Sequence, residues 1–207
     1  MRFLVGAFGT RGDVQPMAAL CQALTAAGHT AEVAVPPSSL AFAQKHGLDC
    51  FPVGLDYEEV SRMTSNGSYR EIMKTMPLLK AEVGRQLEAM DARAARADVV
   101  IGCSAFTVGT LLADLHPKPY VFFAFCPQMF RSGDHPSPSI PFHRLPRWVN
   151  RLTWLYNEVA WRMLLGTTVG AIRKLRGLAA RNSPWQEVIG TRPIACSDPG
   201  FSSPPGP

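Results

Sequence analysis

The sequence of 207 residues lacks several features that would assign it to a class at once. Its five cysteines are odd in number and include no Cys-x-x-Cys pair. Disulfide scaffolds and clustered zinc sites need paired cysteines, so the sequence favours the reducing cytosol. The uncharged, apolar stretch at residues 99–113 is too short to cross a bilayer. The apolar run at residues 3–8 leads straight into charged residues, which is typical of a buried strand and not of a signal peptide.

Charge is also scarce, since charged residues make up 18% of the chain and the net charge of +5 is spread along it. The basic clusters are small, so a nucleic-acid-binding tract is not indicated. Hydrophobic residues make up 46%, which is typical of a folded globular protein and excludes a disordered one.

Two common nucleotide-binding fingerprints are missing. The first glycine-rich turn has glycines at positions 6, 9 and 12, a spacing of Gly-x-x-Gly-x-x-Gly. A dinucleotide site needs Gly-x-Gly-x-x-Gly and an acidic residue at the end of the second strand, but Glu32 lies in the middle of that expected strand. The chain also has no Gly-x-x-x-x-Gly-Lys-[Ser/Thr] loop. A nicotinamide- or flavin-dependent oxidoreductase is therefore disfavoured.

The chain alternates apolar strands with amphipathic helices, the pattern of a doubly wound α/β sheet. We expect strands at 3–8, 30–35, 48–53, 98–103, 119–126 and 193–196. We expect helices at 13–27, 38–45, 71–96 with a break at Pro77, 105–115 and 148–176. The segments expected to be irregular are 54–69, 127–146 and 177–191. One domain over residues 1–196 and a linker-like tail at 197–207 are the expected organisation.

The segment GTRGDVQP at residues 9–16 carries the strongest signal. With the following GHTAEVAVP, it resembles the start of GT-B glycosyltransferases of the sterol glucosyltransferase and glycopeptide-antibiotic glycosyltransferase type. The segments DVVIGCSAF, CPQMFRSGDHPSPSIPF and ACSDPGF support the resemblance, which covers essentially the whole chain. It implies a mostly parallel, Rossmann-like sheet, the N-terminal half of a GT-B fold. The donor-binding C-terminal half has no counterpart here, so we expect a fragment, a split enzyme or a degenerate protein, inactive by itself.

The resemblance also implies an activity. It is the inverting transfer of a sugar from a UDP- or dTDP-sugar to a hydroxyl of a lipophilic acceptor, either a sterol-like lipid or a natural-product aglycone. The nucleotide sugar is a co-substrate, and no cofactor or metal site is expected. A non-catalytic binding or scaffold subunit that recruits a catalytic partner or a membrane-bound acceptor is the alternative. A separate donor-binding chain or self-association would complete the protein.

Asp13 follows the first strand and turn, at the edge of the sheet where such folds bind ligands. Inverting transfer needs a base on the acceptor oxygen. Spacing alone favours a helix-capping role for Asp13, but the family resemblance implies that Asp13 is the catalytic base. Gly9 and Gly12 would let the backbone approach the substrates or would simply form a turn. Together with these two glycines, Thr10 and Arg11 are expected near the donor phosphates, although Arg11 is equally consistent with a solvated side chain.

A second group of candidates follows the fourth strand. Ser104, Ala105 and Phe106 are expected to line the acceptor pocket, with a helix cap at Ser104 and a core position for Phe106 as the alternative. His135, in the proline-rich segment, is a candidate for acceptor contact or proton transfer, against a simple exposed position.

The aromatic and basic segment at 148–165 is consistent with a helix on a membrane surface. Core packing is the favoured interpretation, because five apolar residues fit one buried stripe. They are Val149, Leu152, Leu155, Val159 and Met163. We therefore expect a cytoplasmic protein, with peripheral membrane contact as the variant that suits a lipid acceptor.

Overall fold

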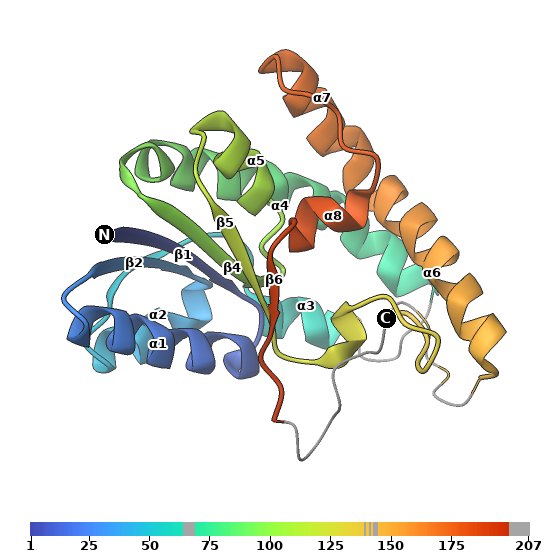
Figure 1. Cartoon of the computed structure of the whole chain (residues 1–207), viewed down its shortest axis with the longest axis horizontal. Coiled ribbons are helices and arrows are strands. Elements are labelled where there is room, and N and C mark those ends of the chain that lie inside the picture. Colours follow the sequence, from blue (N-terminus) through green and yellow to red (C-terminus); the bar gives the residue numbers. More distant parts are fainter. Residues whose placement is uncertain (64–68, 139, 141, 143–144, 199–207) are drawn as a thin grey trace.

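The computed structural model describes residues 1–63, 69–138, 140, 142 and 145–198, and its core is one six-stranded parallel sheet (Figure 1). The strand order is β3-β2-β1-β4-β5-β6. The strands are β1 (Arg2–Phe8), β2 (Thr30–Val35), β3 (Asp49–Pro52), β4 (Val99–Ser104), β5 (Tyr120–Ala124) and β6 (Pro193–Ala195). The predicted doubly wound α/β fold is confirmed, and its strand order reverses between β1 and β4. Such a switch point is where this class of fold binds ligands.

Helices cover both faces of the sheet (Figure 1). They are α1 (Arg11–Ala26), α2 (Leu40–Lys45), α3 (Tyr57–Met63), α4 (Tyr69–Arg96), α5 (Gly109–Leu115), α6 (Arg147–Trp161), α7 (Thr167–Leu175) and α8 (Pro184–Ile189). Alternate residues of β1 point to opposite faces. Val5 packs with Met17 of α1, whereas Leu4 and Phe8 pack in the core that α4 and α5 cover. This two-sided burial explains the continuous apolar run of the first strand.

Several helices differ from the sequence-based expectation. Helix α3 lies within the segment 54–69 and α8 within 177–191, both of which were expected to be irregular. Pro77 does not break α4, which continues to Arg96. Proline removes one backbone hydrogen bond, and the packing of the helix against the sheet outweighs that loss. The predicted helix at 148–176 is interrupted by a π-helical turn, η3 (Arg162–Gly166). The expected tail at 197–207 lies almost wholly outside the described residues.

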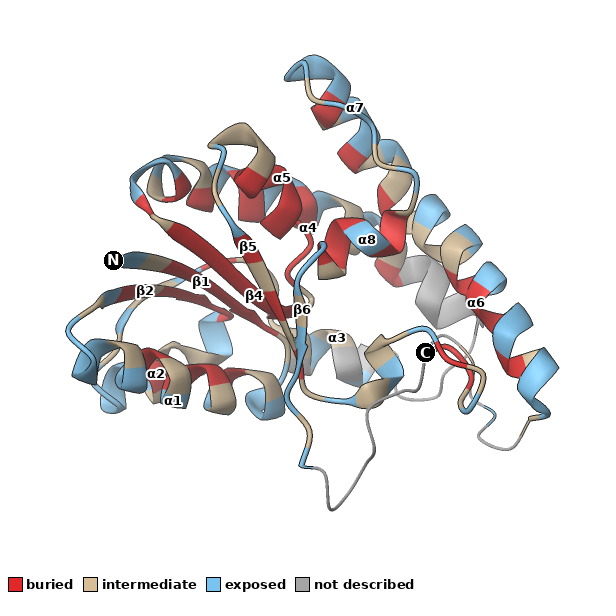
Figure 2. Ribbon diagram, in the orientation of Figure 1, coloured by how far each residue is buried: buried red, intermediate tan, exposed pale blue. Residues whose placement is uncertain are grey.

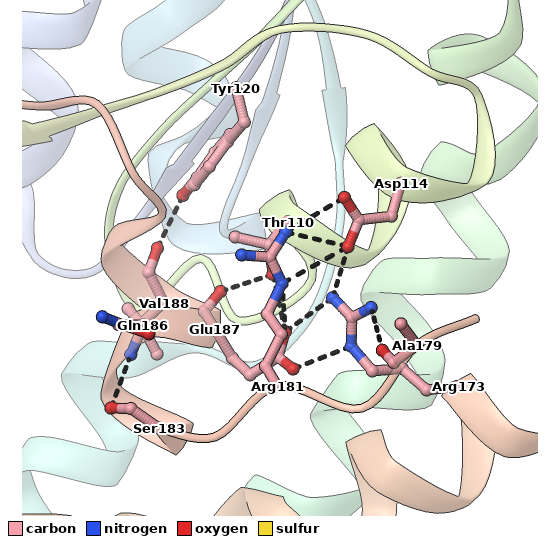
Figure 3. Close-up of polar contacts among 10 residues, drawn as sticks. All are labelled: Thr110, Asp114, Tyr120, Arg173, Ala179, Arg181, Ser183, Gln186, Glu187 and Val188. Atoms are coloured by element: carbon pink, nitrogen blue, oxygen red, sulfur yellow. Dashed lines mark hydrogen bonds and ion pairs between the residues drawn. The ribbon is translucent and has the colours of Figure 1, made fainter.

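An ion-pair network joins α7 and α8 to α5 (Figure 3). The Arg173 guanidinium is buried and donates to Glu187 Oε1 and to Asp114 Oδ2, both at 2.7 Å. Arg181 donates to the same Asp114 carboxylate at 2.9 Å. The Thr110 hydroxyl donates to Glu187 Oε2 at 2.7 Å. Both carboxylates therefore have cationic partners, which the burial of the Glu187 charge requires.

The structure overturns the expected buried stripe of α6. Four of its five members are exposed, namely Leu152, Leu155, Val159 and Met163 at the turn that follows. The fifth, Val149, is half-buried. The buried side chains of α6 are instead Asn150, Thr153, Trp154 and Asn157.

The segment 131–137 explains this reversal, because its backbone needs hydrogen-bond partners. Asn150 Nδ2 donates to the Gly133 carbonyl at 2.9 Å, and Trp154 Nε1 donates to the Ser132 carbonyl at 3.1 Å. The Ser137 N–H donates to Thr153 Oγ1 at 2.8 Å. The inner face of α6 is therefore polar because it binds this segment.

Three tryptophans gather where α6 meets α8. Trp185 packs edge-on against Trp161 and Trp154, with ring centroids 5.2 and 6.2 Å apart. His135 packs in the same way on the other side of Trp154 at 6.1 Å. Trp148, at the start of α6, lies outside this cluster and is 67% exposed.

Candidate functional site

The candidate site lies at the switch point, where β1 and β4 end side by side. The parallel register pairs Phe8 with Ser104, so the turns that follow these two residues meet at one edge of the sheet. Helix α1 begins directly after the first turn, which brings Asp13 to the same place. The Ser104 hydroxyl donates a short hydrogen bond to Asp13 Oδ1. Residues 91 positions apart in the sequence thus form one polar pair.

Asp13 is half-buried, and Thr10 fixes its other carboxylate oxygen. The Thr10 N–H donates to Asp13 Oδ2 at 2.8 Å, and the Thr10 hydroxyl donates to the same oxygen at 3.2 Å. Thr10 is the N-cap residue of α1. Asp13 therefore occupies the third position of the helix and not the cap position that its spacing suggested. A carboxylate has about four acceptor positions. The donors from Thr10 and Ser104 leave one for a further hydroxyl.

The cysteine beside the site is not a reactive group. Burial raises the pKa of the Cys103 thiol well above its ordinary value, and the negative charge of Asp13 raises it further. Its Sγ atom lies 3.9 Å from the backbone carbonyl of Asp13. Cys103 therefore stays protonated and packs as a small apolar side chain. In the described part of the chain, no three His, Cys, Asp or Glu side chains gather as a metal site would require.

Gly9 is required by the geometry of the Asp13 carboxylate. Its φ of +142° is a conformation that L side chains rarely adopt, and an added Cβ would overlap Asp13 Oδ2. Gly12 has no such close neighbour and is exposed. Thr10 and Arg11 are also exposed, and the Arg11 guanidinium lies 5.1 Å from the centre of the Phe42 ring.

Ser104 is held in an unusual backbone conformation, with φ at +43°. Gln86 of α4 braces the turn that follows it. Gln86 Nε2 donates to the Ala105 carbonyl at 3.2 Å, while its Oε1 accepts from the Thr107 N–H at 3.1 Å. Sequence reasoning missed Gln86, although a glutamine among the apolar residues of the buried face of α4 is a signal that could have identified it.

A buried carboxylate lies behind this brace. Glu82 is 1% exposed, and its Oε1 accepts hydrogen bonds from Gln86 Nε2 at 3.0 Å and from the Tyr57 hydroxyl at 3.4 Å. Burial raises the pKa of Glu82 above its ordinary value despite these hydrogen bonds. Glu82 therefore belongs to the support of the site and not to its exposed surface.

Two other acceptor candidates make their contacts away from the Asp13–Ser104 pair. Phe106 is fully buried and stacks on Phe8 at 5.6 Å, in space that Gly6 and Gly102 leave open. Its ring offers no surface to an acceptor, so the alternative core position describes it. His135 is half-buried, and its Nδ1 lies 3.1 Å from the Pro136 carbonyl while its ring packs on α6. The structure thus joins Asp13 to Ser104, and the contacts of His135 belong to another region.

The sheet order and the polar switch point define a Rossmann-like domain, and its fold matches the N-terminal domain of GT-B glycosyltransferases. The crystal structure of glycosyltransferase VinC in complex with dTDP aligns with all of this chain and 51% of that chain, at 21% identity and a TM-score of 0.56. The Streptomyces sp. SF2575 glycosyltransferase SsfS6 aligns with 99% of this chain and 53% of that one, at 19% identity and a TM-score of 0.58. These likenesses show the fold.

Residues 3–114 match the glycosyltransferase family 28 N-terminal domain, and the chain belongs to this family. It is 29% identical over 163 residues to a sterol 3-beta-glucosyltransferase of Aspergillus fumigatus, a match that covers 76% of this chain and 12% of the relative. An uncharacterized glycosyltransferase of Mycobacterium leprae is 37% identical over 81 residues, 39% of this chain and 19% of the relative. The chain therefore spans a small part of these relatives' length and about half of the two solved structures.

Proposed function

We propose that this chain is the acceptor-binding half of an inverting glycosyltransferase and that Asp13 is its catalytic base. The carboxylate of Asp13 at the switch point, oriented by Thr10 and Ser104, is the observation that carries the proposal. Membership of family 28 supports sugar transfer. The sterol glucosyltransferase relatives support a lipophilic, sterol-like acceptor, and a natural-product aglycone is the variant that the fold neighbours suggest.

In this mechanism the acceptor hydroxyl donates its hydrogen bond to the open position of the Asp13 carboxylate. Asp13 takes the proton as the acceptor oxygen attacks the anomeric carbon from the side opposite the leaving group. The bond from that carbon to the nucleoside diphosphate breaks, and the diphosphate leaves with the electron pair. Thr10 and Ser104 fix the direction of the carboxylate, since alignment supplies much of the rate.

The donor is expected to be a UDP- or dTDP-sugar, held mainly by a second domain. The exposed turn of Thr10, Arg11 and Gly12 opens α1 and faces solvent. A helix N-terminus with an exposed cation beside it favours phosphate oxygens. We therefore assign this turn a contact with the donor diphosphate, on the side of the diphosphate that is nearest the acceptor.

The test of the base is the Asp13→Asn substitution in an enzyme that joins this chain to a donor-binding half. Transfer of labelled glucose to a sterol should fall by about 10²- to 10⁴-fold. The melting temperature should change little. Asp49→Asn, at an exposed carboxylate of β3, is the matched control. Full turnover of the Asp13→Asn enzyme would remove Asp13 from the base role.

A second experiment tests the assignment of the donor site. The isolated chain is titrated in a calorimeter with UDP-glucose and then with dTDP-glucose. No saturable heat is expected from either, because most donor contacts are assigned to the second domain. Saturable binding by the isolated chain would contradict this division and would place a donor site within residues 1–207.

A further inference from the structure

The outward face of α6 and of the π-helical turn that follows it carries an apolar stripe, which we call the outer stripe. Its members are Trp148, Leu152, Leu155, Tyr156, Val159 and Met163. Each of these side chains is between 52% and 67% exposed. Their spacing of three, four and seven places them along one side of the helix, and Figure 2 shows exposed residues along the length of α6.

The outer stripe is not an ordinary surface. Soluble proteins rarely expose contiguous apolar side chains over a whole helix face, and such a face marks an interaction site. The helix cannot turn the stripe inward, because Asn150 and Trp154 of its opposite face hold the backbone of the segment 131–137. The polar contacts therefore keep the apolar face directed outward.

Arginines border the outer stripe. A groove of about 470 Å³ lies between α6 and residues 131–134, and its lining includes Arg131, Arg147, Arg151, Leu152 and Leu155. The single acidic residue of this lining, Asp134, pairs with Arg147 at 3.0 Å. The groove therefore keeps an excess of positive charge beside exposed leucines.

We propose that α6 docks on an anionic lipid bilayer. The outer stripe enters the boundary between headgroups and acyl chains, while the arginines of the groove meet lipid phosphates. Trp148 and Tyr156 are the side chain types that favour this boundary. Charge favours an anionic bilayer over a second copy of the chain as the partner. In a two-fold dimer formed through two outer stripes, the arginines that border each stripe would face one another and repel. Among the described residues, no helix is long and apolar enough to span a membrane.

The test is sedimentation of the purified chain with vesicles, without any sugar donor, so that its result is independent of the proposed catalysis. Binding is expected to vesicles that contain phosphatidylglycerol and to fall steeply with added salt. Vesicles of phosphatidylcholine alone should bind much less. The Arg151→Glu variant should lower partition to the anionic vesicles at least about fivefold, and Arg96→Glu, on α4, is the matched control.

The apolar part is tested with the double variant Leu152→Asp and Leu155→Asp. It should lose vesicle binding with an unchanged circular dichroism spectrum, because both side chains are exposed. Leu175→Asp, at an 83% exposed leucine of α7, should bind as the parent chain does. Unchanged binding by the double variant would overturn the proposal. A dimer in light scattering that the double variant separates would also overturn it, and would assign the outer stripe to self-association.

Discussion

Replacing Arg173 with methionine tests whether the ion-pair network holds the C-terminal helices on the sheet. The substitution keeps an apolar stem but removes the charge that partners Glu187 and Asp114. Glu187 has a side chain only 8% exposed, and its remaining cation, Arg181, lies 3.8 Å away. Leaving one buried charge poorly partnered costs about 3–5 kcal/mol of the free energy of unfolding.

The assay is thermal and urea unfolding followed by circular dichroism. For a chain of this size, the expected loss lowers the melting temperature by roughly 6–20 °C. Arg176→Met is the matched control, because Arg176 is exposed and lies 3.6 Å from Asp91. Such a surface pair contributes about 0–1 kcal/mol. If Arg173→Met were as stable as this control, the network would not be what anchors α7 and α8.

The same network predicts the response to acid. Partial burial works to raise the pKa of Asp114, but the hydrogen bonds and charges of Arg181 and Arg173 outweigh it, and the pKa lies below its ordinary value. The folded state therefore binds this proton less readily than the unfolded state. The contribution of Asp114 is present above its unfolded pKa of about 3.9 and is lost as the pH falls through the lower folded value. In acid unfolding experiments, Asp114→Asn should make the free energy of unfolding depend less on pH in this range.

Three further substitutions test the turn at Gly9, the buried Glu82 and the contact of Asn150 with the segment 131–137. Gly9→Ala should cost about 1–3 kcal/mol in unfolding experiments and shift the amide proton resonance of Thr10, because the new Cβ displaces the Asp13 carboxylate. An unshifted Thr10 resonance would show that the turn accommodates the side chain. The raised folded pKa of Glu82 favours its protonated form, so the parent protein should lose stability as the pH rises above about 4.5. Glu82→Gln should remove this loss. Identical pH slopes for the two proteins would contradict this. Asn150→Ala should cost about 1–3 kcal/mol and speed proteolysis within 131–137, whereas unchanged cleavage would mean that other contacts suffice.

The parts of the fold that follow from local pattern were predicted from the sequence. The apolar run at 3–8 indicated a strand covered on both faces, and the structure places it in the middle of the sheet. The motif at residues 9–16 placed Asp13 at the correct edge. The Ser104 hydrogen bond to Asp13 was not foreseen, because it depends on the register of β1 with β4, which is a long-range property.

Helix α6 shows where periodicity stops being informative. The spacing of Leu152, Leu155 and Val159 correctly indicates an apolar face, but spacing does not say which face meets the protein. The backbone of the segment 131–137 decides this by its need for the amide of Asn150 and the indole N–H of Trp154. Gln86 escaped notice for a similar reason, since its partners are backbone groups of a distant turn.

The arrangement of the tryptophans gives the protein its own optical reporter. Trp154, Trp161 and Trp185 lie close enough to exchange excitation energy, and Trp154 also packs edge-on against the His135 ring. Trp148 faces solvent and emits at longer wavelength. The intrinsic fluorescence of this chain therefore resolves into a blue component from the junction of α6 and α8 and a red component from the outer stripe.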